Sequence, residues 1–243
     1  MATEVVLPDR AGDLARLTAE IVACRRCPRL VAWRERVARE KVARFADQTY
    51  WGRPVPGFGD PTARILVVGL APAAHGGNRT GRIFTGDRSG DFLFAALHRT
   101  GLANQASSRA VDDGLRLIGC YLAAAVRCAP PANKPTPLER DTCLPFLIRE
   151  LAILRDVRVI VALGAFGWDA TLRTLAAAGH AARPRPRFGH RAEVRLGPYL
   201  LLCSFHPSQQ NTFTGRLSPA MLEAVLRRAV EASSEGSDSS GVL

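Results

Sequence analysis

Lysine is nearly absent from this chain of 243 residues, because Lys41 and Lys134 are the only two among 33 basic side chains. The remaining basic residues are arginines, and 22 acidic residues leave a formal net charge of +11 at pH 7. A bias of the genome towards arginine accounts for the choice of arginine over lysine. It does not account for the excess of basic residues, which favours a polyanionic partner such as nucleic acid.

Several other patterns are missing as well. No apolar run is long enough to cross a membrane, and the N-terminus lacks the basic-then-apolar segment of a secretory signal. We therefore expect a cytoplasmic protein that does not associate with membranes. Neither Gly-Lys-Ser/Thr nor G-x-G-x-x-G occurs, so the sequence does not indicate an ATPase or a dinucleotide enzyme.

Cysteines are few, at six, and without a secretory signal they argue against a disulfide framework. Four of them have the spacing of metal ligands. Two residues separate Cys24 from Cys27, and far along the chain fourteen residues separate Cys128 from Cys143. Thiolates that converge from such distant positions suit either a tetrahedral zinc ion or a [4Fe-4S] cluster. The spacing alone does not choose between the two.

Strand patterns and helix patterns alternate along the chain. Residues 64–69, 117–126 and 157–163 are apolar runs typical of strands that are buried on both faces. A helix is expected after each of them, and the second begins at Thr136, which combines an N-cap with a proline at the first helical position and a capping-box glutamate. Alternation of this kind predicts an α/β fold with a largely parallel sheet.

The remaining elements complete one domain. Residues 191–196 and 199–205 are expected to pair as strands, and Ser218 begins a last helix. We predict a single domain over residues 1–231, in which the basic N-terminal segment is attached through the cysteine site. Residues 232–243 are rich in serine and glycine and are predicted to be a disordered tail.

Three polar loops leave the expected strands at their carboxyl ends. They cover residues 69–87, 127–136 and 206–215, and the first is rich in small residues that let a ligand approach backbone N–H groups. In open α/β sheets, ligands bind beyond the carboxyl ends of the strands. We therefore expect the functional site where these three loops meet.

The same loops resemble the uracil-DNA glycosylase superfamily, specifically its family 5 branch, which is related to the iron–sulfur family 4 enzymes. The matching segments are Gly69–Gly76 (GLAPAAHG), Thr80–Asp87 (TGRIFTGD), Arg127–Pro137 (RCAPPANKPTP), His206–Ser208 (HPS) and Asn211–Arg216 (NTFTGR). The cysteine spacing fits this resemblance. Family 4 members carry an acidic residue directly after the first glycine of the first segment. This chain has Leu70 there, which is the family 5 pattern.

The resemblance implies the fold, the activity and the metal group. It implies a single-domain α/β/α sandwich around a central, mostly parallel four-stranded sheet. It also implies a structural [4Fe-4S] cluster on Cys24, Cys27, Cys128 and Cys143. The activity would be excision of uracil from DNA, with hypoxanthine and other deaminated or modified bases as possible further substrates. We expect a monofunctional enzyme that acts as a monomer on uracil-containing DNA.

Asp87, Asn133 and His206 are expected to be catalytic, and Phe84 is expected to bind the substrate. Phe84 is placed by the resemblance to stack on a flipped base, although it could also be a core residue. The amide of Asn133 can donate to and accept from a uracil edge, or cap its own loop. His206, preferably neutral, is expected to donate a hydrogen bond to the O2 atom of the departing uracil. Asp87 is the candidate for orienting water or stabilising the sugar cation, with helix capping as its rival role.

Further residues are expected around these four. Gly69, Leu70, Ala71 and Ala73 would line the base site. Asn78, or the backbone of residues 71–74, could hold the water instead of Asp87. His75 is ambiguous between a phosphate contact and loop packing. The residues expected to contact DNA are Lys134, Gln209, Gln210 and Arg216, of which the two glutamines occupy the place of the loop that wedges into the duplex in relatives.

Two other functions are compatible with part of these observations. A non-catalytic nucleic-acid-binding protein whose fold is stabilised by a bound metal would explain the charge and the cysteines. It would not explain the glycine-rich loop, Asn133 and His206 together. An iron–sulfur electron carrier is disfavoured, because one cluster in a large basic α/β domain is a poor design for a carrier.

Overall fold

The computed structural model describes residues 9–235, which form helices around one sheet of six strands. The strand order is β1-β3-β2-β4-β6-β5. The strands are β1 (Phe58–Gly59), β2 (Ile65–Gly69), β3 (Cys120–Ala124), β4 (Val159–Leu163), β5 (Glu193–Leu196) and β6 (Tyr199–Ser204). The four central strands are parallel, as predicted. The expected four-stranded sheet was nevertheless too small, because β1 and β5 add antiparallel strands at its two edges.

The central strands consist of buried apolar residues that alternate between two cores. Ile65 and Val67 of β2 belong to one core, and Leu66 and Val68 belong to the other. This alternation follows from the two-residue period of a strand. Because both faces are covered, the strands read as continuous apolar runs in the sequence.

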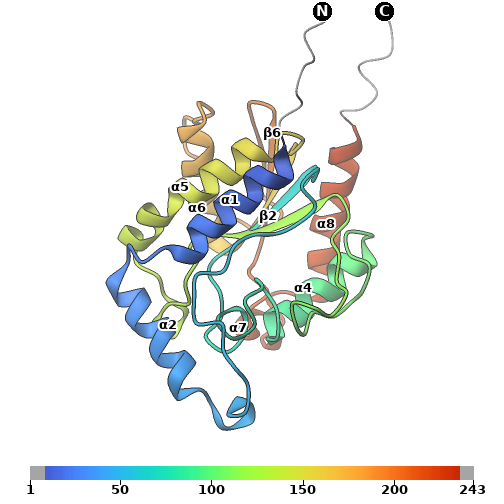
Figure 1. Cartoon of the computed structure of the whole chain (residues 1–243). Coiled ribbons are helices and arrows are strands. Elements are labelled where there is room, and N and C mark those ends of the chain that lie inside the picture. Colours follow the sequence, from blue (N-terminus) through green and yellow to red (C-terminus); the bar gives the residue numbers. More distant parts are fainter. Residues whose placement is uncertain (1–8, 236–243) are drawn as a thin grey trace, which may run out of the picture.

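Helices cover both faces of the sheet, as Figure 1 shows. One face carries α1 (Arg10–Ala23), α5 (Pro137–Ile153) and α6 (Gly164–Ala177), and the other carries α4 (Arg88–Arg99) and α8 (Pro219–Ser234). This arrangement confirms the predicted α/β/α sandwich. No helix in residues 9–235 is long and apolar enough to cross a membrane.

Local sequence signals account for where several helices begin. Thr136 and Glu139 form the predicted capping box at the start of α5, with Thr136 Oγ1 accepting from Glu139 N and Glu139 Oε2 accepting from Thr136 N. Ser218 caps α8 as expected. The end of α8 differs from the prediction, because the helix continues to Ser234 although the tail was expected from residue 232. The rest of that tail, residues 236–243, lies outside the described residues.

Short elements lie within segments that were expected to be loops. The first strand-end loop contains α3 (Gly77–Thr80), the second contains the 3-10 turn η2 (Pro131–Asn133), and the third contains α7 (Gln209–Phe213). The basic N-terminal segment contains the helix α2 (Pro28–Glu40) and the 3-10 turn η1 (Ala43–Phe45).

Candidate active site and thiol cavity

A cavity of about 490 Å³ opens at the carboxyl ends of the parallel strands. Its volume lies within the usual range for small-molecule sites. We call it the strand-end pocket, and all three predicted loops contribute to its lining. It is lined by Leu70, Ala71, Ala73, Phe84, Asp87, Ser89, Ala132, Asn133, Lys134, His206, Ser208, Gln209 and Gln210. Segments far apart in the sequence therefore meet where the topology of an open α/β sheet predicts.

Strained backbone is concentrated at this pocket. Five non-glycine residues in the described chain have positive φ angles, and three of them line the pocket: Phe84 at 54°, Ala132 at 51° and Asn133 at 55°. Left-handed conformations are costly for residues with a Cβ atom and persist only where the surrounding structure enforces them. Their concentration here supports a functional role for the pocket.

Phe84 belongs both to the pocket and to the core. Its side chain is only 6% exposed and packs in the core shared with α4 and α8, while its ring also lines the pocket. A Cβ atom on Gly69 would lie 2.5 Å from the ring, so glycine is required at the end of β2 for the ring to fit. The ring centroid of Phe84 lies 6.2 Å from that of His206. The two expected roles of Phe84, core packing and base stacking, are thus compatible.

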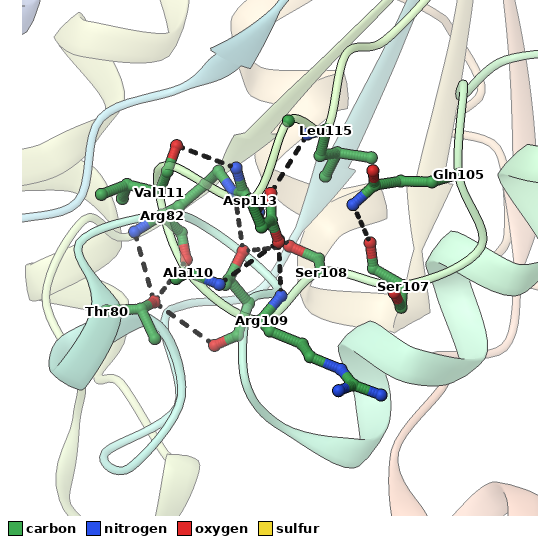
Figure 2. A network of polar contacts seen from close by, with 12 residues as sticks. Thr80, Arg82, Gln105, Ser107, Ser108, Arg109, Ala110, Val111, Asp113 and Leu115 are labelled. Carbon is green, nitrogen blue, oxygen red and sulfur yellow. Dashed lines mark hydrogen bonds and ion pairs between the residues drawn. The ribbon is translucent and has the colours of Figure 1, made fainter.

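An ion pair between the buried Arg82 and the partly buried Asp113 holds the segment that carries Phe84 (Figure 2). Arg82 donates to both carboxylate oxygens of Asp113 at 2.8 Å, to Ser108 Oγ at 2.7 Å and to Thr85 Oγ1 at 3.0 Å. The hydroxyl groups of Thr85 and Ser108 lie 2.6 Å apart. Hydrogen bonds from Arg82 and from three backbone N–H groups hold the pKa of Asp113 at about 2, although burial opposes this. Asp113 is therefore ionised at neutral pH, and the segment before Asp87 is fixed on the loop around Ser108.

Asp87 lies in the pocket and also caps α4. Its Oδ1 accepts a hydrogen bond from Gly90 N at 3.0 Å, which confirms the capping geometry. A Cβ atom on Gly76 would collide with the carboxylate, so the glycine-rich loop lets the two segments approach closely. Burial raises the pKa of Asp87, and it outweighs the opposing effects of the capping N–H groups and of Arg79. A carboxylate made more basic by burial suits a role in accepting a proton or orienting water.

His206 is a neutral imidazole at physiological pH. Burial lowers its pKa from the ordinary 6.5 to about 4. Within residues 9–235 no protein group forms a hydrogen bond with its ring, whereas its backbone carbonyl accepts from Asn211 Nδ2 at 2.8 Å. The backbone is thus fixed while the ring remains able to donate to a ligand.

Further polar groups in the lining come from η2 and from Lys134, which follows it. Asn133 and Lys134 line the pocket, and among the described residues the amide of Asn133 has no hydrogen-bond partner. Gln209 and Gln210 lie at the start of α7 and are exposed at the mouth. The small and apolar side chains of the first loop, together with these polar groups, leave room for a planar heterocycle.

Four of the residues expected at the site lie outside the pocket lining, namely Gly69, His75, Asn78 and Arg216, and the side chains of the last three have other partners. His75 contacts Tyr50, whose hydroxyl lies 3.0 Å from His75 Nδ1. Asn78 is fully buried and donates from Nδ2 to the carbonyl of Arg34 at 3.2 Å. The guanidinium of Arg216 stacks over Phe205, 4.5 Å from the ring centroid. These three side chains pack and brace the surrounding loops.

The four spaced cysteines line one separate cavity, which we call the thiol cavity. Cys24 ends α1, Cys27 is the N-cap of α2, Cys128 follows β3, and Cys143 lies in α5. Apolar residues surround them, including Leu30. Chain segments separated by about a hundred residues therefore place these four cysteines around one cavity.

Two donors point at the sulfur atoms of the thiol cavity. Arg34, only 1% exposed, donates from Nη1 to Cys128 Sγ at 2.9 Å, and the backbone N–H of Arg127 donates to Cys143 Sγ at 3.3 Å. Such donors stabilise anionic thiolates, the form in which cysteine binds metal. The residues present fit a thiolate-bound group. In the described part of the chain, however, no three His, Cys, Asp or Glu side chains are grouped so that they could hold a metal ion.

Sequence reasoning missed some of the pocket residues. Ser89 and Ala132 line the pocket, and so does Ser208, which the sequence marks only as part of His-Pro-Ser. Ser89 could have been predicted as a pocket residue, because it lies two residues after Asp87 at the start of a helix. Ala132 gives no such signal in the sequence, because its distinctive feature is a left-handed backbone conformation.

Comparisons with known proteins agree with this geometry. Residues 56–229 match the family model described as Uracil DNA glycosylase superfamily. A Type-5 uracil-DNA glycosylase of Mycobacterium bovis is 57% identical over 221 residues, which cover 90% of this chain and 81% of that protein. Another, of Thermus thermophilus, is 55% identical over 218 residues, covering 89% and 97%. A Type-4 uracil-DNA glycosylase of Pyrobaculum aerophilum is 34% identical over 116 residues, covering 47% and 51%.

Proposed function

Since the chain belongs to the uracil-DNA glycosylase superfamily, in its type-5 branch, we propose that it is a monofunctional DNA glycosylase. It flips uracil out of DNA into the strand-end pocket and hydrolyses the N-glycosidic bond, which initiates base excision repair. The observation that carries the proposal is the meeting of Phe84, Asp87, Asn133 and His206 in one pocket from three distant segments.

The pocket recognises the flipped base by stacking and by hydrogen bonds. A base inside the duplex cannot be reached, so the enzyme compensates for the lost stacking when it extrudes the nucleotide. Phe84 supplies a ring for stacking. Asn133, exposed and without a partner among the described residues, supplies a donor and an acceptor for the uracil edge. Gln209 and Gln210 at the mouth fill the space that the flipped base leaves in the duplex.

His206 stabilises the departing base. As the glycosidic bond breaks, negative charge develops on the uracil and positive charge on the sugar. A neutral imidazole N–H aimed at uracil O2 strengthens as this charge develops, and it does so without first losing a proton. The depressed pKa of His206, about 4, supports this assignment.

Asp87 orients the attacking water and stabilises the sugar cation. Its raised pKa and its presence in the pocket support this role, and Oδ1 keeps the carboxylate oriented through its bond from Gly90 N. Asn78, the alternative water ligand, donates its amide to a backbone carbonyl outside the pocket. The carboxylate of Asp87 therefore takes over the role of the acidic residue that family 4 enzymes carry where this chain has Leu70.

A wider range of bases is part of the proposal. Leu70, Ala71 and Ala73 form a wall without charged groups, which leaves room for hypoxanthine and other modified bases. Lys134 is the only lysine near the pocket. We assign it to a phosphate contact, so that no Schiff base forms and no lyase step follows.

One assay tests the activity and its monofunctional character together. Duplexes that contain uracil or hypoxanthine are incubated with the protein, and half of each sample is heated in alkali to cut abasic sites. We expect strand breaks only after alkali. The absence of breaks on every substrate would contradict a glycosylase. Breaks without alkali, with a borohydride-trapped adduct that Lys134→Ala abolishes, would contradict a monofunctional enzyme.

The pH dependence of excision should reveal the ionised aspartate and the neutral histidine. Asp87 must be ionised, so the single-turnover rate should fall as the pH drops through the raised pKa of Asp87. The ring of His206 is already neutral well above pH 4, so it should produce no step near its ordinary pKa of 6.5. Rates measured from about pH 4.5 to 8 check both points. A step near 6.5 that disappears in His206→Gln would show that this histidine is protonated in the working enzyme.

We also propose that the four cysteines of the thiol cavity hold a structural [4Fe-4S] cluster. In such a cluster each thiolate binds a different iron atom, so the sulfur atoms need not approach as closely as around one ion. The shared cavity and the hydrogen bonds to Cys128 and Cys143 support this proposal. These four residues would hold the cluster, which when bound would join α1, α2, α5 and the segment after β3 and would supply no step of the excision.

A further inference from the structure

A second cavity, of about 880 Å³, adjoins the strand-end pocket. Asp87 and Gln209 line both of them, so the two cavities are neighbours that meet at these two side chains. Four arginines line this cavity, which we call the basic groove: Arg44, Arg79, Arg88 and Arg109. Two carboxylates, Asp87 and Asp91, also line it and offset part of the charge.

Three of these arginines have no acidic partner. Arg44, Arg88 and Arg109 are exposed, and in residues 9–235 none of them forms an ion pair. Many other arginines are neutralised by the chain itself, for example Arg228 with Glu193 at 2.9 Å. Excess positive charge is therefore concentrated beside the pocket and is available to a ligand from outside.

The groove also presents an exposed aromatic ring. Phe213, in α7, is 67% exposed, and the guanidinium of Arg88 lies 5.2 Å from its ring centroid. Large apolar side chains seldom remain this exposed without a partner. Basic side chains next to an exposed ring are typical of grooves that follow a nucleic-acid backbone and stack its bases.

Arg109 is held in a fixed place by the network of Figure 2. Asp113 Oδ2 accepts from Arg109 N at 2.6 Å and from Ala110 N at 3.2 Å, and the same carboxylate binds the buried guanidinium of Arg82. Figure 2 shows the Arg109 side chain extending away from this network. The loop thus presents its free guanidinium from a rigid base, which reduces the entropy lost on binding.

Resting on the proposed function, we infer that the basic groove binds the DNA segment next to the flipped nucleotide. Arg44, Arg88 and Arg109 contact successive phosphates of the backbone, and Phe213 stacks on a neighbouring base. Arg79 differs from these three, because its Nε, Nη1 and Nη2 donate to His75 O, Gln48 Oε1 and Gly86 O and so hold its guanidinium within the protein. It adds positive charge at the base of the groove.

The test measures binding to a duplex with a central tetrahydrofuran abasic analogue, at several salt concentrations. Arg88→Ala and Arg109→Ala should each raise Kd roughly tenfold at about 0.1 M salt. Each should also lower the slope of log Kd against log salt concentration by about 1, because one phosphate contact is lost. Arg109→Lys keeps the charge and should keep the slope. Phe213→Ala should raise Kd roughly tenfold with no change of slope, because stacking releases no counterions.

Arg116→Ala is the matched control. Arg116 is exposed, forms no ion pair in the described chain and lies outside the groove, so its loss should leave Kd and slope within about twofold of wild type. If Arg88→Ala and Arg109→Ala behave like Arg116→Ala while the wild type excises uracil, the inference about the groove is wrong and the proposed function stands. If the wild type excises no base, the proposed function fails whatever the binding data show.

Discussion

Asp87→Asn is expected to lower the single-turnover rate of uracil excision by about 10³-fold while the melting temperature stays the same. The amide cannot accept a proton from water or stabilise a cationic sugar. It can still cap α4, because asparagine and aspartate are equally good N-caps. The variant therefore removes the charge of Asp87 and keeps its hydrogen bond from Gly90 N.

Asp87→Ala completes the comparison, because it also removes the cap. We expect the same loss of rate together with a decrease of about 1 kcal/mol in the free energy of unfolding. Denaturant unfolding and excision are measured on both variants. Should Asp87→Asn retain the wild-type rate, Asp87 would be a helix cap only, and the groups that hold the water would have to lie elsewhere in the pocket.

Cys128→Ala should have the largest effect on the protein as a whole. We expect loss of bound iron and sulfide, loss of the visible absorbance of the cluster, and a melting temperature lower by more than about 10 °C. Excision should be lost as well, because Cys128 precedes the turn that carries Ala132 and Asn133. The substitution also removes Cys128 Sγ, the acceptor for the buried guanidinium of Arg34.

Cys120→Ala is the control for this experiment. Cys120 is fully buried in β3 and lies outside the thiol cavity, so its replacement removes a core thiol but no ligand. We expect full iron content and only a small loss of stability. The cluster would be refuted if Cys128→Ala kept full activity and the wild-type melting temperature, and if the wild type contained no iron. If the wild type contained zinc in place of iron, the group would not be an iron–sulfur cluster, but the four cysteines would still be joined by a metal.

Much of the fold could be predicted from local signals. The strands that are buried on both faces are continuous apolar runs, and the capping box at Thr136 marks the start of α5 to the residue. The place of the pocket followed from topology, because the carboxyl ends of parallel strands meet at one edge of the sheet. Phe84, Asp87, Asn133 and His206 each lie in a loop that leaves such an end.

Other features could not be predicted, because they depend on pairs of distant residues without a local pattern. Strand β1 has only two residues, Phe58 and Gly59, and exists because β3 offers them an edge. The ion pair of Arg82 with Asp113 joins residues 31 positions apart in sequence, and Asp113 lies outside every motif that the sequence shows. Asn78 was misleading for a similar reason, because a polar residue in a glycine-rich loop gives no sign that it is fully buried.

Arg29 joins the N-terminal segment to the pocket. From α2 its Nε donates to Glu139 Oε1 at 2.7 Å and its Nη2 donates to the carbonyl of Lys134 at 3.2 Å. Glu139 also closes the capping box of α5, so one carboxylate serves two helices at once. Consequently α2 cannot detach without fraying the start of α5 and releasing the turn behind Asn133. We therefore expect these segments to open together, so that hydrogen exchange of their backbone amides should report a common free energy of opening.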